Sequence, residues 1–111
     1  MIQDLIIYQK SYDLILWIFP IINRFPQKQR FVLGQQIENE LLEIIKDIIL
    51  ANNEINKSGI LKRISVRLDT LRTLVRLAKD LKFLNIKHYE NTAVKMNEMG
   101  KLLNGWAKGF S

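Results

Sequence analysis

Side chains that could carry out chemistry are scarce in this sequence. Its 111 residues contain no cysteine and a single histidine, His88, so a zinc site built from Cys and His ligands is excluded. The four serines have only this histidine to serve as a base, and the five glycines are scattered rather than gathered into a phosphate-binding loop. We therefore expect a protein without enzymatic activity, metal or cofactor.

A group of carboxylates lies between residues 38 and 47 and comprises Glu38, Glu40, Glu43 and Asp47. In a helix, Glu40, Glu43 and Asp47 share one face, because residues three and four positions apart are neighbours. A solvated acidic stripe, or a contact with the basic helix of a neighbouring molecule, explains this face better than acid–base catalysis does.

Basic residues are concentrated further along the chain. Residues 57–85 carry eight basic and two acidic side chains, whereas the whole chain has a net charge of +6. Such an excess attracts an anionic polymer or surface most strongly. In a helix these cations form two strips, one of Arg72, Arg76 and Lys79 and another of Arg63 and Arg67.

Phosphate contact explains this excess better than solvation alone. Asp69 can pair with Arg72, and Asp80 can pair with Arg76, but exposed ion pairs contribute little, about 0.2–1 kcal/mol each. Because arginine forks hold phosphate by two-point contacts, we expect electrostatic, weakly sequence-specific binding of RNA or DNA that weakens as salt rises. The candidate nucleic-acid-binding residues are Lys62, Arg63, Arg67, Arg72, Arg76 and Lys79.

A protein partner is the alternative for the same basic segment. The arginines could contact the acidic face of residues 27–53 in another subunit, and the protein would then be a purely protein–protein scaffold. A ring of subunits could instead display the cations around a groove or pore, where they would concentrate the field on a flexible anionic strand.

The apolar pattern that must position these residues is helical throughout, and no segment alternates as a half-buried strand does. Pro20 should kink or end the first helix, Pro26 is suited to open the second, and Asn85 is suited to cap the fourth. The four helices predict an all-α fold, an antiparallel up-down-up-down four-helix bundle that forms one domain over residues 1–111. They are expected at about residues 3–23, 27–53, 58–84 and 86–109.

Apolar residues three and four positions apart indicate the buried face of each helix. The core sets are Leu33, Ile37, Leu41, Ile44, Ile48 and Ala51 in the second helix, Leu61, Ile64, Leu68, Leu71, Val75 and Ala78 in the third, and Tyr89, Ala93, Met96, Met99, Leu103, Trp106 and Phe110 in the fourth. A further apolar set, Phe31, Leu42, Ile45 and Ile49, lies about 100° round the second helix. The width of this apolar arc predicts burial on two sides, and hence a subunit interface.

No part of the sequence is typical of a membrane protein. The longest apolar run covers residues 14–22, and a helix needs about 20 apolar residues to cross a bilayer. The N-terminal MIQDLIIYQK has no basic start and no small-residue cleavage site, so we expect no signal peptide.

Three stretches resemble one protein family when they are taken together. They are RFPQKQRFVLGQQI (residues 24–37), LDTLRTLVRLAKDLKFLNIKHYE (68–90) and MGKLLNGWAKG (99–109). In this order and spacing they resemble the accessory variability determinant (Avd) proteins of diversity-generating retroelements. A related branch, encoded in intervening sequences of bacterial ribosomal RNA and of unknown role, usually has a serine-rich segment ending in Glu-Gly late in its second helix. This chain has IIKDIILANNEIN (44–56) there, which favours the Avd branch.

The resemblance implies a homopentamer of four-helix bundles with a basic surface, located in the cytoplasm and encoded by a bacterium, an archaeon or a phage. Such a protein binds RNA and DNA and associates with the reverse transcriptase of the element, which holds the catalytic centre. The pair supports mutagenic retrohoming. Arg72, Arg76 and Lys79 match basic positions of the family, whereas Gln27 stands where the family commonly has a basic residue.

Overall fold

The computed structural model describes residue 2 and residues 5–109 of the chain. All regular structure in this part of the chain is helical, which confirms the all-α fold. The elements are α1 (Ile6–Ile22), α2 (Gln27–Gln29), the π-helical turn η2 (Arg30–Gly34), α3 (Gln35–Asn53), α4 (Ser58–Asp80) and α5 (Ile86–Gly109).

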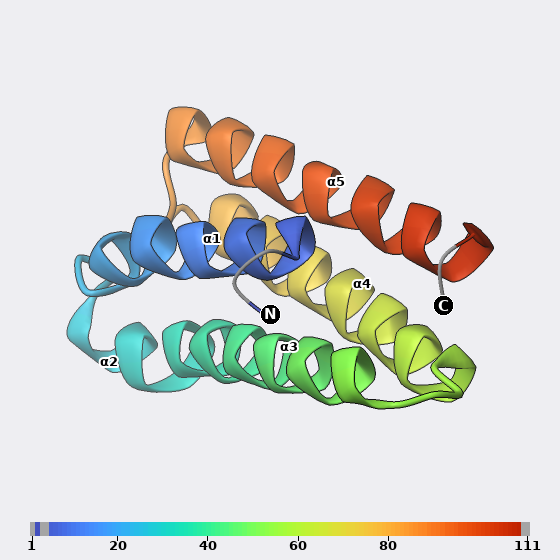
Figure 1. Cartoon of the computed structure of the whole chain (residues 1–111). Coiled ribbons are helices and arrows are strands. Elements are labelled where there is room, and N and C mark those ends of the chain that lie inside the picture. The colour runs from blue at the N-terminus through green and yellow to red at the C-terminus, as the bar shows by residue number, and fades with distance from the viewer. Residues whose placement is uncertain (1, 3–4, 110–111) are drawn as a thin grey trace.

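The long helices α1, α3, α4 and α5 pack side by side as a bundle in which successive helices run in opposite directions (Figure 1). α3 packs against α1 and α4, and α5 packs against α4 and closes the ring against α1. The bundle measures 43 × 22 × 22 Å. The basic helix α4 is therefore flanked by α3 on one side and by α5 on the other.

The core of the bundle contains most of the apolar residues that helical spacing predicts, together with residues of α1. The whole set expected in the second helix and the whole set expected in the third are buried. The buried apolar residues of α5 are Met96, Met99, Leu103 and Trp106. Of the other residues expected there, Tyr89 and Ala93 are half-buried, and Phe110 lies outside the described residues.

Two prolines lie at the connection between α1 and α2. Pro20 is within the last turn of α1, and the helix continues for two residues beyond it to Ile22. Pro26 directly precedes α2, and its carbonyl accepts hydrogen bonds from the Gln29 and Arg30 N–H groups at 2.8 and 2.9 Å. The second helix therefore opens at Pro26, as expected.

The second expected helix consists of three consecutive parts, α2, η2 and α3. Gly34 in η2 lies against the end of α1, because a Cβ atom at this position would come within 2.7 Å of the Ile22 Cγ2 atom. A π turn inserts one residue into the helical repeat. With this insertion Leu33 is buried, whereas Phe31 is 63% exposed.

The turn between α4 and α5 is closed by backbone hydrogen bonds and by a side-chain cap. Lys82 has left-handed backbone with a φ of 67°, so α4 ends four residues before the expected position. The Phe83 N–H donates to the Ala78 carbonyl (2.9 Å) in a Schellman motif. Asn85 Oδ1 accepts a hydrogen bond from the His88 N–H (2.7 Å), which confirms Asn85 as the N-cap of α5.

Candidate nucleic-acid interface

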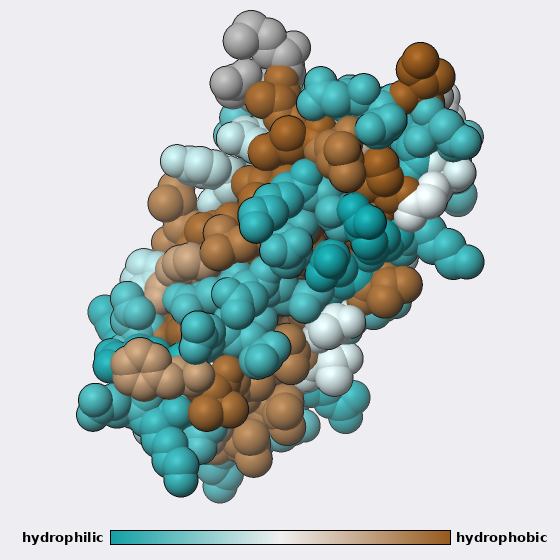
Figure 2. Space-filling view, turned by 90° about the horizontal axis from the view of Figure 1, so that it is seen from below, coloured by the Kyte–Doolittle hydropathy of each residue, from teal (hydrophilic) through white to brown (hydrophobic). Residues whose placement is uncertain are grey.

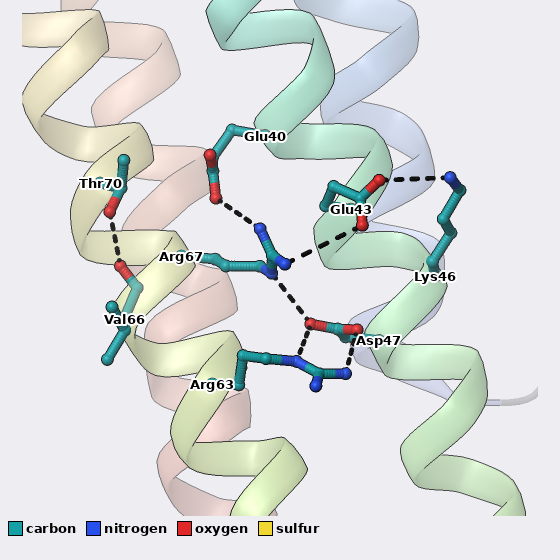
Figure 3. Close-up of polar contacts among 8 residues, drawn as sticks. All are labelled: Glu40, Glu43, Lys46, Asp47, Arg63, Val66, Arg67 and Thr70. Atoms are coloured by element: carbon teal, nitrogen blue, oxygen red, sulfur yellow. Dashed lines mark hydrogen bonds and ion pairs between the residues drawn. The ribbon is translucent and has the colours of Figure 1, made fainter.

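The two flanks of α4 differ in how their cations are partnered. On the flank that faces α3, Arg63 binds Asp47 through two hydrogen bonds, Nε–Oδ2 at 2.9 Å and Nη2–Oδ1 at 2.7 Å (Figure 3). Arg67 donates to Asp47 Oδ2 (3.0 Å) and to Glu40 Oε1 (3.2 Å), and its Nη2 atom lies 3.9 Å from Glu43 Oε2. The acidic face of α3 therefore meets a basic helix of its own chain.

The environment of Asp47 keeps these cations in place. Asp47 is 5% exposed, and burial favours the neutral form of a carboxyl group. Hydrogen bonds and positive charge from Arg63 and Arg67 outweigh burial, so the pKa of Asp47 lies below its ordinary value. Both arginines thus have intramolecular partners, and the structure assigns this flank of α4 to the contact with α3.

The flank of α4 that faces α5 carries the other predicted strip. Arg72 pairs with Asp69 (3.0 Å), and Arg76 lies 3.7 Å from Asp80, as their spacing on the helix predicted. Lys79 also contacts Asp80 (3.2 Å). The Arg76 side chain is 72% exposed, compared with 50% for Arg63 and 29% for Arg67 on the α3 flank. Arg76 is therefore the most accessible arginine of the two strips.

Arg72 crosses the backbone of α5 at Gly100. A Cβ atom on Gly100 would come within 2.6 Å of the Arg72 Nη2 atom, so the absence of a side chain at this position provides the space that the guanidinium occupies. Glycine within a helix costs about 1 kcal/mol relative to alanine. The contact with Arg72 gives a packing reason for this glycine in the middle of α5.

Two hollows flank this crossing and together form what we call the α4–α5 groove. One has a volume of about 450 Å³ and the other of about 310 Å³, and both are lined by Arg72 and Asn97. The other polar residues of the groove are Ser65, Asp69, Thr73, Arg76, Tyr89, Lys101 and Asn104. Cations that can contact phosphate thus lie beside amide and hydroxyl groups that can hydrogen bond to sugars and base edges.

The structure separates the six predicted nucleic-acid-binding residues into four groups. Arg63 and Arg67 pair with α3, Arg72 and Arg76 line the groove, and Lys79 lies with its Nζ atom 4.6 Å from the centre of the Tyr89 ring. Lys62 is exposed and lines neither hollow.

Sequence reasoning missed the contribution of α5 to this surface. Asn97, Lys101 and Asn104 stand at intervals of four and three residues, so they lie on one side of that helix. This spacing was the available signal. That their side faces α4 follows from helix packing.

Two other kinds of site have no support in the described part of the chain. Its acidic and histidine side chains form no group of three that could hold a metal ion. None of the described helices is both long enough and apolar enough to cross a membrane.

Comparison with known proteins gives one family. The model of the family described as bAvd-like matches residues 5–110, which is nearly the full length of the chain. Among curated proteins, none matches the chain.

Proposed function

The chain belongs to the bAvd-like family, and this membership implies an accessory role in a diversity-generating retroelement. We propose a mechanism for that role. The protein is a non-enzymatic accessory that binds RNA or DNA in the α4–α5 groove. It associates with the reverse transcriptase of the element and thereby holds the template or the cDNA beside the polymerase during mutagenic retrohoming.

The observation that carries the proposal is the unequal partnering of the arginines of α4. Carboxylates of α3 engage Arg63 and Arg67, whereas Arg76 lies 3.7 Å from a single, half-exposed carboxylate. An exposed ion pair of this kind is worth about 1 kcal/mol or less. A phosphate group can therefore replace Asp80 as the partner of Arg76 at little cost.

The chemistry of the groove favours a backbone-directed mode of binding. Arg72 and Arg76 can each present a planar fork to a phosphate, and Lys101 adds a cation from α5. Each phosphate contact releases condensed counterions, so the affinity falls as salt rises. Asn97 and Asn104 can bond to sugars or base edges, but four bases share this chemistry, so sequence preference is weak.

A second surface, which we call the apolar face, lies on the opposite side of the bundle, between α1 and α3. Its exposed apolar residues are Tyr12, Leu16, Phe31, Leu42 and Ile49, between 40% and 63% exposed. On the face of the molecule that Figure 2 shows, apolar surface lies on both sides of a hydrophilic band. The family suggests a homopentamer, and this face supports assembly with further copies.

Co-expression with the reverse transcriptase, followed by mass measurement of the purified complex, tests the association with the polymerase.

Charge reversal in the groove tests nucleic-acid binding. We expect R76E/K101E to weaken binding of single-stranded RNA and DNA, and to reduce the slope of log K against log salt by about 0.7 for each phosphate that the variant no longer binds. Fluorescence anisotropy over a salt series measures both quantities. The matched control K28E/K46E changes the net charge equally at exposed lysines of α2 and α3.

The control distinguishes groove binding from a general effect of charge. Equal losses of affinity in the two double variants would contradict a site in the groove. Wild-type affinity that does not change with salt would contradict phosphate contact altogether. If R76E/K101E instead dissociates an oligomer, the scaffold alternative is the correct one.

A further inference from the structure

A hollow of about 760 Å³ lies at one end of the bundle, beyond the α4–α5 groove. It is formed by the end of α1, the turn between α4 and α5 and the first residues of α5, at the end where α1 passes into α2 (Figure 1). Ile21 and Phe83 contribute apolar surface to the lining, and Arg24, Lys79 and Lys82 contribute cations. The hollow therefore combines an apolar wall with a group of positive charges.

The positive charge of this hollow is largely unpartnered. Among its described lining residues Asp80 is the one carboxylate, and Asp80 is shared between Lys79 (3.2 Å) and Arg76 (3.7 Å). Within the described part of the chain, neither Arg24 nor Lys82 has a carboxylate in ion-pair distance. Three cations and one carboxylate leave the lining with a net charge of +2, not counting His88.

Lys82 occupies a backbone position that favours glycine. Its φ of 67° is left-handed, and it is the residue that follows the helix end in the Schellman motif. Glycine adopts this conformation without the steric conflict that a Cβ atom causes. The fold of the turn therefore gives no reason for a lysine here, and the position of this lysine at the hollow offers one.

We propose that this hollow binds a phosphomonoester dianion. A phosphomonoester carries a charge of about −1.5 to −2 at neutral pH, which matches the net +2 of the lining better than the single charge of a phosphodiester does. Arg24 can hold two phosphate oxygens at once, and Lys82 supplies a second charge-assisted hydrogen bond. The apolar wall suits the sugar or base attached to the phosphate.

The side chains, and not the helix start alone, define this site. Asn85 Oδ1 already accepts the His88 N–H, so the first turn of α5 is capped. The hollow also adjoins the groove, because Lys79 lines the hollow while its Nζ atom lies over Tyr89, which lines the groove. A strand bound along the groove can therefore place its terminal phosphate in the hollow, and this part of the proposal rests on the proposed function.

The test compares strands that differ at their ends. One short single-stranded RNA is prepared with a 5′-phosphate, with a 3′-phosphate or with hydroxyls at both ends, and AMP and inorganic phosphate serve as free ligands. We expect the wild-type protein to bind one of the phosphate-ended strands roughly tenfold more tightly than the hydroxyl-ended strand, the effect of one charge-assisted hydrogen bond. K82G removes a cation of the hollow and should therefore lose most of this preference. It should also gain thermal stability, because glycine adopts the left-handed backbone at this position without steric conflict.

Two controls separate the possible outcomes. R24Q should also lose the preference, whereas K46Q removes one exposed cation of α3 and should keep it. The proposal is overturned if the wild-type protein binds all three strands equally and neither AMP nor phosphate changes its Tm. Salt-dependent binding of the strands would in that case still support the proposed binding in the α4–α5 groove. If no strand binds but AMP or phosphate raises the Tm of the wild type and not of K82G, the hollow takes a free phosphomonoester and the proposed function fails.

Discussion

At the scale of single residues, Asp47 determines what the arginines of α4 can do. A carboxylate that is 5% exposed would be costly without partners. Three hydrogen bonds from Arg63 and Arg67 satisfy both of its oxygens. The same contacts hold α3 against α4. Asp47 therefore converts two cations that resemble a phosphate site in the sequence into a structural contact.

Replacing Asp47 with asparagine tests this structural role. D47N leaves two arginines without the charge of their common partner, and we expect a loss of about 1–3 kcal/mol in the free energy of unfolding at pH 7. Because the folded-state pKa of Asp47 is lowered, its stabilisation is present above the unfolded-state pKa of about 3.9 and is lost as the pH falls through the folded-state value.

Urea unfolding of both proteins at pH 7 and near pH 3 measures this difference. The free-energy gap between wild type and D47N should narrow at the lower pH, because pH 3 lies below the unfolded-state pKa of about 3.9 and the unfolded chain then binds a proton that the folded carboxylate resists. A gap of the same size at both values would show that the Asp47 charge is not what stabilises the contact.

At the scale of elements, the turn between α4 and α5 is held by two local devices and one tertiary contact. The Schellman motif ends α4, Phe83 packs against Phe25 with ring centres 6.1 Å apart, and Asn85 caps α5. These devices set the relative position of the two helices that form the α4–α5 groove. They also place Lys82 at the edge of the hollow at the end of the bundle.

Removing the cap of α5 should lower stability without changing the fold. N85A leaves the His88 N–H without its acceptor, and caps of this type contribute about 1 kcal/mol. Thermal or urea unfolding measures the loss. N85S keeps a side-chain acceptor and should recover most of the stability, and an equal loss in N85A and N85S would mean that the hydrogen bond has no energetic role.

At the scale of the whole molecule, two unlike surfaces lie on opposite sides of the bundle. The ring order of the helices places the α4–α5 groove across the core from the apolar face of α1 and α3. The first surface is basic and polar, and the second exposes Phe31, Leu42 and Ile49. A protein arranged in this way can assemble through one side while it leaves the other side open to an anionic strand.

Assembly through the apolar face predicts a selective effect of new charges. Leu42 and Ile49 are each 40% exposed and lie two turns apart on α3, so L42E/I49E introduces two carboxylates into the proposed interface. We expect this variant to sediment as a smaller species than the wild-type protein, with unchanged helical content by circular dichroism.

The control variant places the same charges on the other side of the bundle. V66E/V94E alters residues of α4 and α5 that are 58% and 57% exposed, and it should keep the wild-type sedimentation coefficient. A wild-type protein that sediments as a monomer at high micromolar concentration would contradict assembly through this face.

Much of the fold could be predicted because its signals are local. The spacing of Leu61, Leu68 and Val75 identifies a buried helical face without knowledge of any neighbour, since the backbone repeat alone brings such residues to one side. The cap at Asn85 is also local, because its donor is three residues away. The π turn at Arg30–Gly34 escaped prediction, because it depends on how closely α1 approaches Gly34.

The order of the amino acids was enough to predict the four helices, most of their buried faces and the concentration of cations in one of them. Which of these cations pair with a neighbouring helix depends on tertiary packing. Arg63 and Asp47 are 16 residues apart in sequence, and Arg72 and Gly100 are 28 apart. Helical periodicity depends on the backbone of one segment, but a salt bridge or a crossing of this kind depends on the register between two packed helices. That register is set by the core as a whole, so the chain had to be folded before the groove could be recognised.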